Sequence, residues 1–258
     1  MVATDVMKLD AEADHASRVA HVRTCALWGL ETALVSVEAD VANGLPHFSI
    51  VGLPDTAVSE ARERARAAIR NSGFEFPLRR IVVNLAPAER RKEGTGFDLA
   101  IALAILRASD QLKTDVDGLC LGELSLDGAI RPVRGVMPRI LRAREAGIER
   151  AYLPADNASE AAALGSEAIA LRTLRAAVEH LDGRIRLVPS PTPAPGKEPV
   201  WDVDLSDVAG QETPKRALEI AAAGGHNLLF IGPPGTGKTM LARALPSILP
   251  PLEPDETL

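Results

Sequence analysis

Aromatic residues are scarce in this chain: phenylalanine, tryptophan and tyrosine together make up 3% of 258 residues, whereas hydrophobic residues make up 46%. The chain is therefore expected to be globular, with a core built from aliphatic side chains and alanine. Long apolar runs are also missing. The longest, around residues 99–106, is far shorter than the ~20 residues that a membrane-spanning helix needs.

Cysteines are few, and the N-terminus has no apolar central region of the kind found in secretory signals. Cys25 and Cys120 lie far apart in the sequence, so we expect two free buried thiols rather than a disulfide framework. No Cys/His spacing is typical of zinc. Together these absences predict a cytoplasmic protein without a membrane segment.

An excess of basic residues is absent as well, since the net charge is −6. The charge is unevenly distributed, however. Residues 55–92 contain nine basic and five acidic residues, and residues 131–150 contain six basic and two acidic residues. Local basic faces can exist on an acidic protein and contact phosphates. For the arginines of residues 55–72 we favour a solvated helix face, with Glu60 and Glu63 pairing with Arg64 and Arg66. The cluster at residues 90–92 has no interleaved aromatic residue for stacking bases.

The most informative motif is a complete phosphate-binding loop, G-x-x-x-x-G-K-T, at residues 232–239. Residues 227–231 are apolar and predict a buried strand before it, and residues 240–245 predict a helix after it. Glycines allow backbone amides to turn inward around phosphate oxygens, and a helix N-terminus adds partial positive charge there. The predicted nucleotide-binding residues are Gly232, Pro233, Pro234, Gly235, Thr236, Gly237, Lys238, Thr239 and Met240.

Two residues of this loop have specific expected roles. Lys238 is predicted to reach the β- and γ-phosphates of ATP, and the Thr239 hydroxyl is predicted to ligate Mg²⁺, a cation that prefers oxygen. The sequence ends 19 residues after the loop, before any acidic Walker B strand, sensor or arginine finger. We therefore expect the chain to bind ATP without turning it over.

The domain organisation follows from a proline-rich segment. Five prolines fall within residues 188–199 and exclude a helix or central strand there. We expect a disordered extension at 1–20, a first domain at 21–187, a linker at 188–200 and the beginning of a motor domain at 201–258.

The first domain alternates strand and helix patterns, which predicts an α/β class, or α+β with a mixed sheet. Residues 127–128 form an expected hairpin turn, and Asp98 is expected to cap the helix that begins beside it. Expected strands are 33–39, 47–51, 79–85, 118–124, 151–153 and 168–171. Expected helices are 55–72, 97–106, 137–146, 157–164 and 173–181, followed by 213–223 in the second domain.

Several blocks of sequence resemble the YifB/ComM family of magnesium-chelatase-like AAA+ proteins. They are residues 39–46, 50–55, 81–87, 92–99 and 215–227. The resemblance covers nearly the whole chain. It implies an N-terminal Lon-protease-like α+β domain followed by the start of a P-loop AAA+ α/β domain.

Residues 122–128, with Pro132 and Gly135, resemble the proteolytic domain of Lon, which uses a serine nucleophile and a lysine base. The resemblance puts the serine position at Gly96 and the lysine position at Met137. Glycine has no nucleophile and methionine accepts no proton, so the protease site is expected to be vacant. Ser125 and Lys92 are weak substitutes.

The family resemblance also implies an activity: a ring-shaped, ATP-driven DNA motor, a homo-hexamer when full length, that promotes branch migration of incoming DNA. A chelatase-like ATPase that remodels a protein partner is the alternative, and an active Lon-like peptidase is a third. DNA binding would separate the first two, and covalent labelling of a serine would indicate the third.

Overall fold

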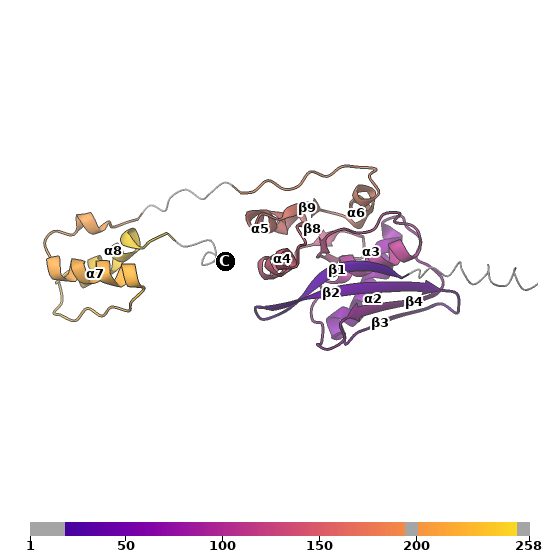
Figure 1. The fold of residues 1–258 in the computed structure, drawn as a ribbon, viewed down its shortest axis with the longest axis horizontal. Coiled ribbons are helices and arrows are strands. Elements are labelled where there is room, and N and C mark those ends of the chain that lie inside the picture. Colours follow the sequence, from indigo (N-terminus) through magenta and orange to yellow (C-terminus); the bar gives the residue numbers. More distant parts are fainter. Residues whose placement is uncertain (1–18, 194–200, 252–258) are drawn as a thin grey trace, which may run out of the picture. The chain divides into compact units, whose positions relative to one another are not determined.

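The structure, a computed structural model, describes residues 19–193 and 201–251, which form two compact units that are treated separately (Figure 1). The expected extension therefore lies mostly outside the described residues, although Ala20 already begins a strand. Residues 188–193 of the expected linker have no regular secondary structure, and 194–200 are outside the described part. Within residues 19–193 and 201–251, no helix is long and apolar enough to cross a membrane.

A seven-stranded mixed sheet organises the first unit, in the order β3-β4-β2-β1-β5-β8-β9. Strand β2 pairs antiparallel with β1 and β4, and the other four pairings are parallel. A short hairpin of β6 and β7 forms a second sheet. The strands are β1 (Ala20–Trp28), β2 (Glu31–Ala42), β3 (His47–Val51), β4 (Arg80–Ala86), β5 (Leu119–Cys120), β6 (Glu123–Leu124), β7 (Ile130–Arg131), β8 (Arg150–Pro154) and β9 (Glu167–Leu171).

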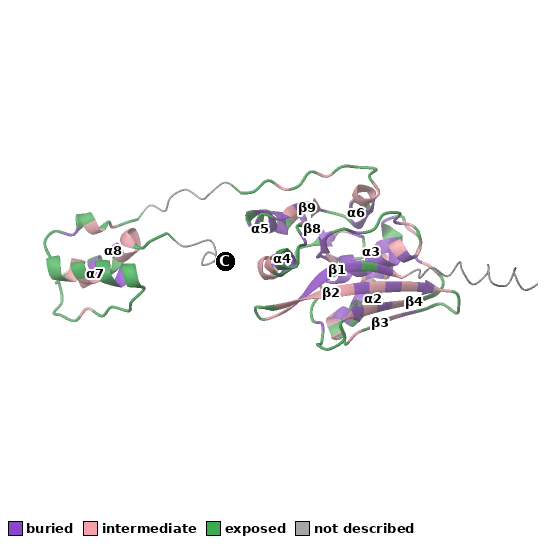
Figure 2. Cartoon of the chain, viewed as in Figure 1, coloured by how far each residue is buried: buried purple, intermediate pink, exposed green. Residues whose placement is uncertain are grey.

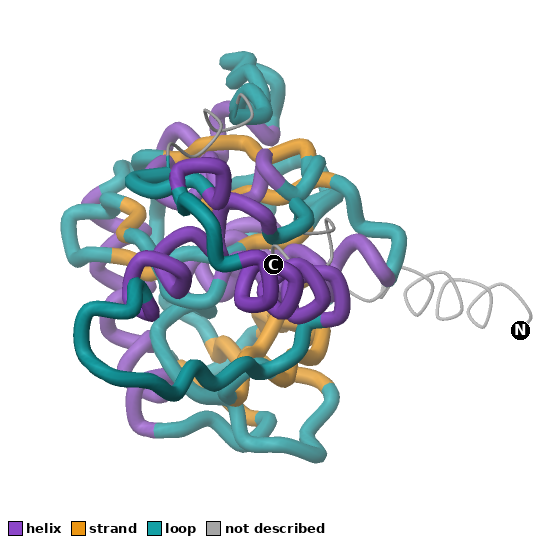
Figure 3. Tube along the Cα trace, turned by 90° about the vertical axis from the view of Figure 1, so that its left-hand side faces the viewer, coloured by secondary structure: helices purple, strands orange, loops and turns teal. Residues whose placement is uncertain are grey.

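Helices cover both faces of this sheet (Figures 1 and 3). One core cluster joins the strands to α2, α3 and α6, and the other joins them to α4 and α5. Neighbouring strand residues such as Ala151 and Tyr152 belong to different clusters, as the alternation of side chains across a strand requires. The helices are α2 (Thr56–Asn71), α3 (Asp98–Ala108), α4 (Val136–Glu145), α5 (Ala158–Ala163) and α6 (Leu174–Leu181).

Helix α2 shows how closely the local sequence specifies its structure. Asp55 is the N-cap, and its carboxylate accepts a hydrogen bond from the Val58 amide at 2.7 Å. Apolar residues spaced for one helical face form its buried stripe, whose members are Val58, Ala61, Ala65, Ala68 and Ile69. Helix α3, expected at residues 97–106, is buried on every side except at Arg107, as suits a segment that is apolar all round.

Strand β1 was not predicted, because the expected extension and the first expected strand left residues 21–32 unassigned. A two-residue turn at Gly29 and Leu30 joins it to β2, and the two pair along nine residues from Ala20↔Ala39 to Trp28↔Glu31. The alternation of exposed His21 and Arg23 with buried neighbours was the available signal.

The single strand predicted at 118–124 is also wrong, because the segment divides into β5 and β6. Gly122 lies between them, and its backbone bonds to the first turn of α3 and the residues just before it instead of to a strand. Its amide donates to the Gly96 carbonyl at 3.2 Å, and its carbonyl accepts from the Leu99 amide at 3.1 Å. The hairpin turn at 127–128 between β6 and β7 is confirmed.

The second unit is a small helical body. It contains α7 (Glu212–Gly224), α8 (Lys238–Ala244) and two 3-10 turns, Leu205–Asp207 and Leu245–Ile248, packed around Val208, Leu218, Leu241 and Ala244. Most of its surface is exposed or intermediate (Figure 2). The helix predicted at 213–223 is confirmed and ends at Gly225, which adopts φ +61°.

The buried strand predicted at 227–231 is not formed. The segment has no regular structure, and Leu229 and Ile231 are 79% and 88% exposed. A strand needs a hydrogen-bonded neighbour, and residues 201–251 contain no other strand to provide one.

Candidate functional site

The loop at residues 232–239 is exposed along most of its length and leads directly into α8. Gly235 and Gly237 adopt φ +83° and +79°, conformations that other residues rarely take, and Gly237 is the N-cap of the helix. A Cβ at Gly235 would meet nothing within 4 Å, so backbone conformation rather than crowding requires glycine there.

Lys238 holds its ammonium group over the loop. Its Nζ donates to the carbonyl oxygens of Gly232 at 2.9 Å and Pro233 at 2.7 Å, and lies 3.3 Å from Thr236 Oγ1. An ammonium group is a compact, rotatable donor of three hydrogen bonds, so these carbonyl bonds can be exchanged for bonds to phosphate oxygens without moving the helix.

The backbone amides of the loop also suit the binding of phosphate. Among the described residues, the backbone N–H groups of Gly235, Thr236, Gly237, Lys238 and Thr239 donate to no protein acceptor. Consecutive unpaired amides in a glycine-rich turn form a concavity that attracts anions. The residues present therefore fit the triphosphate of a nucleotide, with the Thr239 hydroxyl at the helix start and Met240, 39% exposed, beside it.

Gln211 was not assigned a role from sequence. It is the N-cap of α7, with φ +61°, and its side-chain amide donates to the Thr236 carbonyl at 2.8 Å. It therefore braces the middle of the loop from a position 25 residues earlier. No local pattern marks such a contact, because it depends on the packing of α7 beside the loop.

The two positions matched to the Lon catalytic residues lie in neighbouring parts of the first unit. Gly96 is buried before α3, and Met137 is half-buried near the start of α4. Arg139, two residues after Met137, is 6% exposed and extends its guanidinium to Gly96. A Cβ added at Gly96 would lie 2.7 Å from Arg139 Nη1. A cation therefore occupies the space into which a side chain at position 96 would project.

Lys92 and Ser125, the weak substitutes for the catalytic residues of Lon, form their contacts away from Gly96. Lys92 is buried, its Nζ donates to the Pro87 carbonyl, and burial lowers its pKa. The Ser125 hydroxyl hydrogen-bonds the Asp127 carboxylate and lies 3.1 Å from the Ala129 carbonyl oxygen in its own hairpin. Neither is directed at Gly96 by any contact among the described residues.

Asp98 does not cap α3, which corrects the sequence prediction. Its fully buried carboxylate instead forms a two-pronged ion pair with Arg64 of α2, at 2.6 and 3.0 Å, and accepts the Leu124 amide at 3.1 Å. Burial raises the pKa of Asp98, while Arg64 and the Leu124 amide oppose that rise. These contacts join α2, α3 and β6. The position of Asp98 at a helix end did not indicate its partner, because the partly buried Arg64 guanidinium binds the carboxylate more strongly than the helix amides would.

Cys25 and Cys120 are free and buried, as predicted. Burial raises the pKa of Cys25 to about 11 and that of Cys120 further. Neither is suited to nucleophilic chemistry, since the thiolate is the reactive form. Within the described ranges, no group of three or more His, Cys, Asp or Glu residues is placed to hold a metal.

The fold and the glycine-rich loop agree with the comparison with known families, which assigns the chain to the magnesium-chelatase-like proteins. The family described as subunit ChlI of Mg-chelatase matches residues 37–157, and the family described as magnesium chelatase, subunit ChlI, matches residues 204–258. The chain belongs to the YifB/ComM family within this class.

Individual relatives agree with this assignment. YifB of Salmonella typhimurium is 46% identical over 243 residues, which cover 93% of this chain and 48% of that protein. Competence protein ComM of Haemophilus influenzae is 45% identical over 242 residues, which cover 90% of this chain and 47% of that protein. The chain thus spans about half the length of the curated relatives it matches.

A more distant relative supports the fold of the first unit. A Lon protease of Syntrophomonas wolfei is 24% identical over 136 residues, which cover 50% of this chain and 17% of that protein. With the mixed sheet, this confirms a Lon-like first unit followed by the start of an AAA+ unit.

Proposed function

We propose that residues 232–239 bind the triphosphate of ATP, with Mg²⁺ ligated by the Thr239 hydroxyl. The observation that carries this is the loop itself: five neighbouring amides that have no protein acceptor among the described residues, with the Lys238 ammonium held over them. Bound Mg²⁺ would neutralise phosphate charge, and the protein's part is to supply amide and ammonium donors in a fixed arrangement.

We further propose that the chain is part of a ring-shaped, homo-hexameric motor that acts on DNA in the cytoplasm. Membership in a family that includes a competence protein supports a role with DNA. The remodelling of a protein partner is the second candidate, and the match to a chelatase subunit favours it. A nucleotide-dependent mobility shift of branched DNA by the full-length protein would support the first candidate, and the absence of any shift would support the second.

Hydrolysis by the 258-residue chain alone is expected to be negligible. Phosphoryl transfer needs a group that positions the attacking water and an arginine that stabilises the developing charge, in addition to the loop. Phosphate release by the purified chain should not exceed that of its Lys238→Ala variant. Turnover clearly above that baseline would show that the chain carries the remaining machinery.

The first unit is proposed to be a protease fold without peptidase activity. Restoring both catalytic residue types, with Gly96→Ser and Met137→Lys, is expected to leave the protein unlabelled by a fluorophosphonate probe. The Arg139 guanidinium fills the space beside position 96, so the new serine would crowd a buried cation and destabilise the fold by roughly 1–3 kcal/mol.

Mass spectrometry of probe-treated protein and thermal melting monitored by circular dichroism would measure both effects. Ser125→Ala is the matched control for probe specificity, since that hydroxyl is held within its own hairpin. Labelling of the unmodified chain at any serine would revive the peptidase hypothesis.

A further inference from the structure

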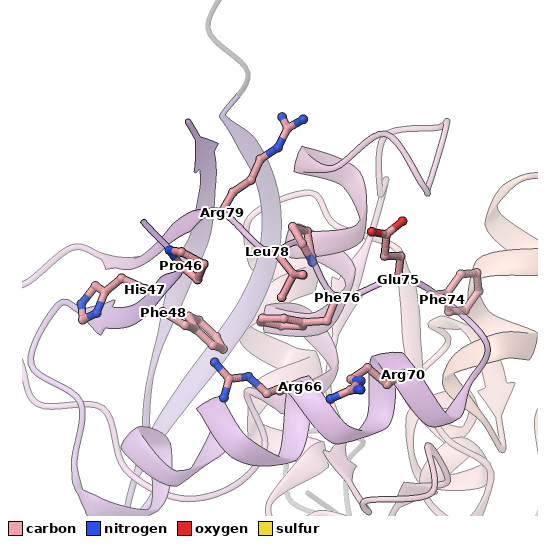
Figure 4. Close-up of a pocket in the computed structure, with 11 residues that line it drawn as sticks. Pro46, His47, Phe48, Arg66, Arg70, Phe74, Glu75, Phe76, Leu78 and Arg79 are labelled. Atoms are coloured by element: carbon pink, nitrogen blue, oxygen red, sulfur yellow. The ribbon is translucent and has the colours of Figure 1, made fainter. Parts of the chain in front are cut away.

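A groove on the first unit lies between α2, the start of β3 and the segment that leads into β4 (Figure 4). Its volume is about 560 Å³, within the range of small-ligand sites. Phe48 and Phe76 form an apolar floor, with ring centroids 5.6 Å apart, and Leu78 stands 78% exposed at the rim.

The walls of the groove are cationic. Arg66, Arg70 and Arg79 line it, and Glu75 is the only acidic residue among the lining residues. The Arg66 guanidinium lies 5.2 Å from the centroid of Phe76, above the floor. A local excess of positive charge on a chain of net charge −6 selects an anionic partner.

These arginines are largely uncompensated, in contrast to Arg62, Arg64 and Arg90 of the same basic segment. Within the described part of the chain, Arg70 and Arg79 make no ion pair, and Arg66 approaches only Glu63, at 3.7 Å. By comparison, Arg64 is buried against Asp98, and Arg90 pairs with Glu31 at 2.9 Å while covering Trp28. The sequence prediction of a solvated helix face paired with Glu60 and Glu63 therefore holds for Arg66, whose side chain is partly exposed and approaches Glu63. It holds only in part for Arg64, which lies 3.6 Å from Glu60 but is mostly buried and pairs with Asp98.

We propose that this groove binds single-stranded DNA. The inference rests on the DNA role proposed above and gives it a contact surface. Arg66 and Arg70 lie one helical turn apart on α2, about 6 Å along its axis, so that they can contact successive phosphates. Leu78 is 78% exposed and, together with the Arg66 guanidinium above Phe76, offers a surface for an unpaired base, whereas the Phe48 and Phe76 rings are only 4% and 9% exposed. A paired duplex could not present its bases to such a surface.

The test is fluorescence anisotropy of a fluorescein-labelled oligothymidylate of about 20 nucleotides, a length above the site sizes of single-strand binding modules, titrated with the purified chain. Arg66→Ala/Arg70→Ala is expected to weaken binding about tenfold at about 50 mM salt. Each phosphate contact in a single strand contributes about 0.7 to the slope of log affinity against log salt, so losing two contacts should lower the slope by about 1.4. Arg66→Lys/Arg70→Lys, which keeps both charges, should retain most of the slope.

Arg142→Ala is the matched control, since Arg142 is an exposed arginine on α4, paired with Glu145 at 3.0 Å and outside the groove. The Arg142→Ala variant should bind the oligonucleotide with the same affinity and the same dependence of log affinity on log salt as the unmodified chain. If Arg66→Ala disturbs the fold through loss of its contact with Phe76, Arg70→Ala/Arg79→Ala tests the same prediction with two exposed residues.

Failure to bind the oligonucleotide, or equal binding by the groove variants, would overturn the proposal. Displacement of the oligonucleotide by polyglutamate at equal charge concentration would also overturn it, in favour of an acidic peptide as the occupant. Binding of ATP at the loop would be unaffected by any of these results. A mobility shift of branched DNA by the full-length protein that persists in the groove variants would leave the DNA role standing while removing this surface from it.

Discussion

Replacing Lys238 with alanine is expected to lower the affinity of the chain for MgATP by about 100-fold, or roughly 3 kcal/mol. The ammonium group makes charge-assisted hydrogen bonds, each worth roughly 1.5–3 kcal/mol when the partner is a charged phosphate oxygen. In the free chain the same group bonds only to neutral loop oxygens, so its loss should affect nucleotide binding much more than folding.

Titration with a fluorescent N-methylanthraniloyl-ATP in the presence of Mg²⁺ measures this change. Lys215→Ala is the matched control, because Lys215 lies on α7 and its side chain makes no hydrogen bond to the loop among the described residues. Thr239→Ala should weaken binding in Mg²⁺ and have little effect in excess EDTA. Equal affinities for the unmodified chain and Lys238→Ala would refute the proposed phosphate site.

Replacing Arg64 with alanine is expected to destabilise the first unit by roughly 3–5 kcal/mol near neutral pH. The change leaves the Asp98 carboxylate fully buried without its counter-charge, while Arg64 itself is only 18% exposed. A surface pair is worth far less, so Arg142→Ala, which breaks the pair with Glu145, should stay within about 0.5 kcal/mol.

The loss of stability in Arg64→Ala should become smaller as the pH is lowered. Burial raises the pKa of Asp98, and without Arg64 the main opposing group is gone. A carboxyl group whose pKa is higher in the folded than in the unfolded state binds its proton more readily when folded. The stability of Arg64→Ala relative to the unmodified chain should therefore rise as pH falls from about 7.5 toward the unfolded value of about 3.9.

Urea unfolding followed by circular dichroism at pH values of about 7.5 and about 5 measures both effects, and Asp98→Asn provides the reciprocal variant. The asparagine side chain would keep the shape of the aspartate but leave Arg64 with only the exposed Glu60, at 3.6 Å, as a charge partner. If the free energy of unfolding falls by less than about 1 kcal/mol in both variants, the packing of α2 against α3 does not depend on this ion pair.

Local sequence patterns were sufficient wherever a segment's structure depends on its own residues. The N-cap at Asp55, the apolar stripe of α2 and the buried helix α3 all follow from spacing along one element. Strand β1 and the division of residues 118–124 into β5 and β6 did not follow from local spacing, because pairing with a distant segment defines them. Gly122 illustrates this, since its backbone bonds to residues 96 and 99 rather than to a strand.

The residues of the proposed nucleotide site divide in the same way into those that local sequence identifies and those that it does not. Gly235, Gly237 and Lys238 could be identified from the motif, because glycine conformations and a lysine at fixed spacing are local properties. Gln211, which braces the loop, could not be identified. The strand predicted at 227–231 failed for a related reason: an apolar run specifies burial only when another segment is present to cover it.

The sequence by itself determined the family, the phosphate-binding loop and the absence of serine and lysine at positions 96 and 137, since each depends only on which residues occupy which positions. Only the tertiary structure decided that Arg139 fills the space beside Gly96, that Asp98 pairs with Arg64, and that three arginines and two phenylalanines line one groove. The physical reason is that charge and steric contacts act through space, and the chain path alone determines which distant residues meet.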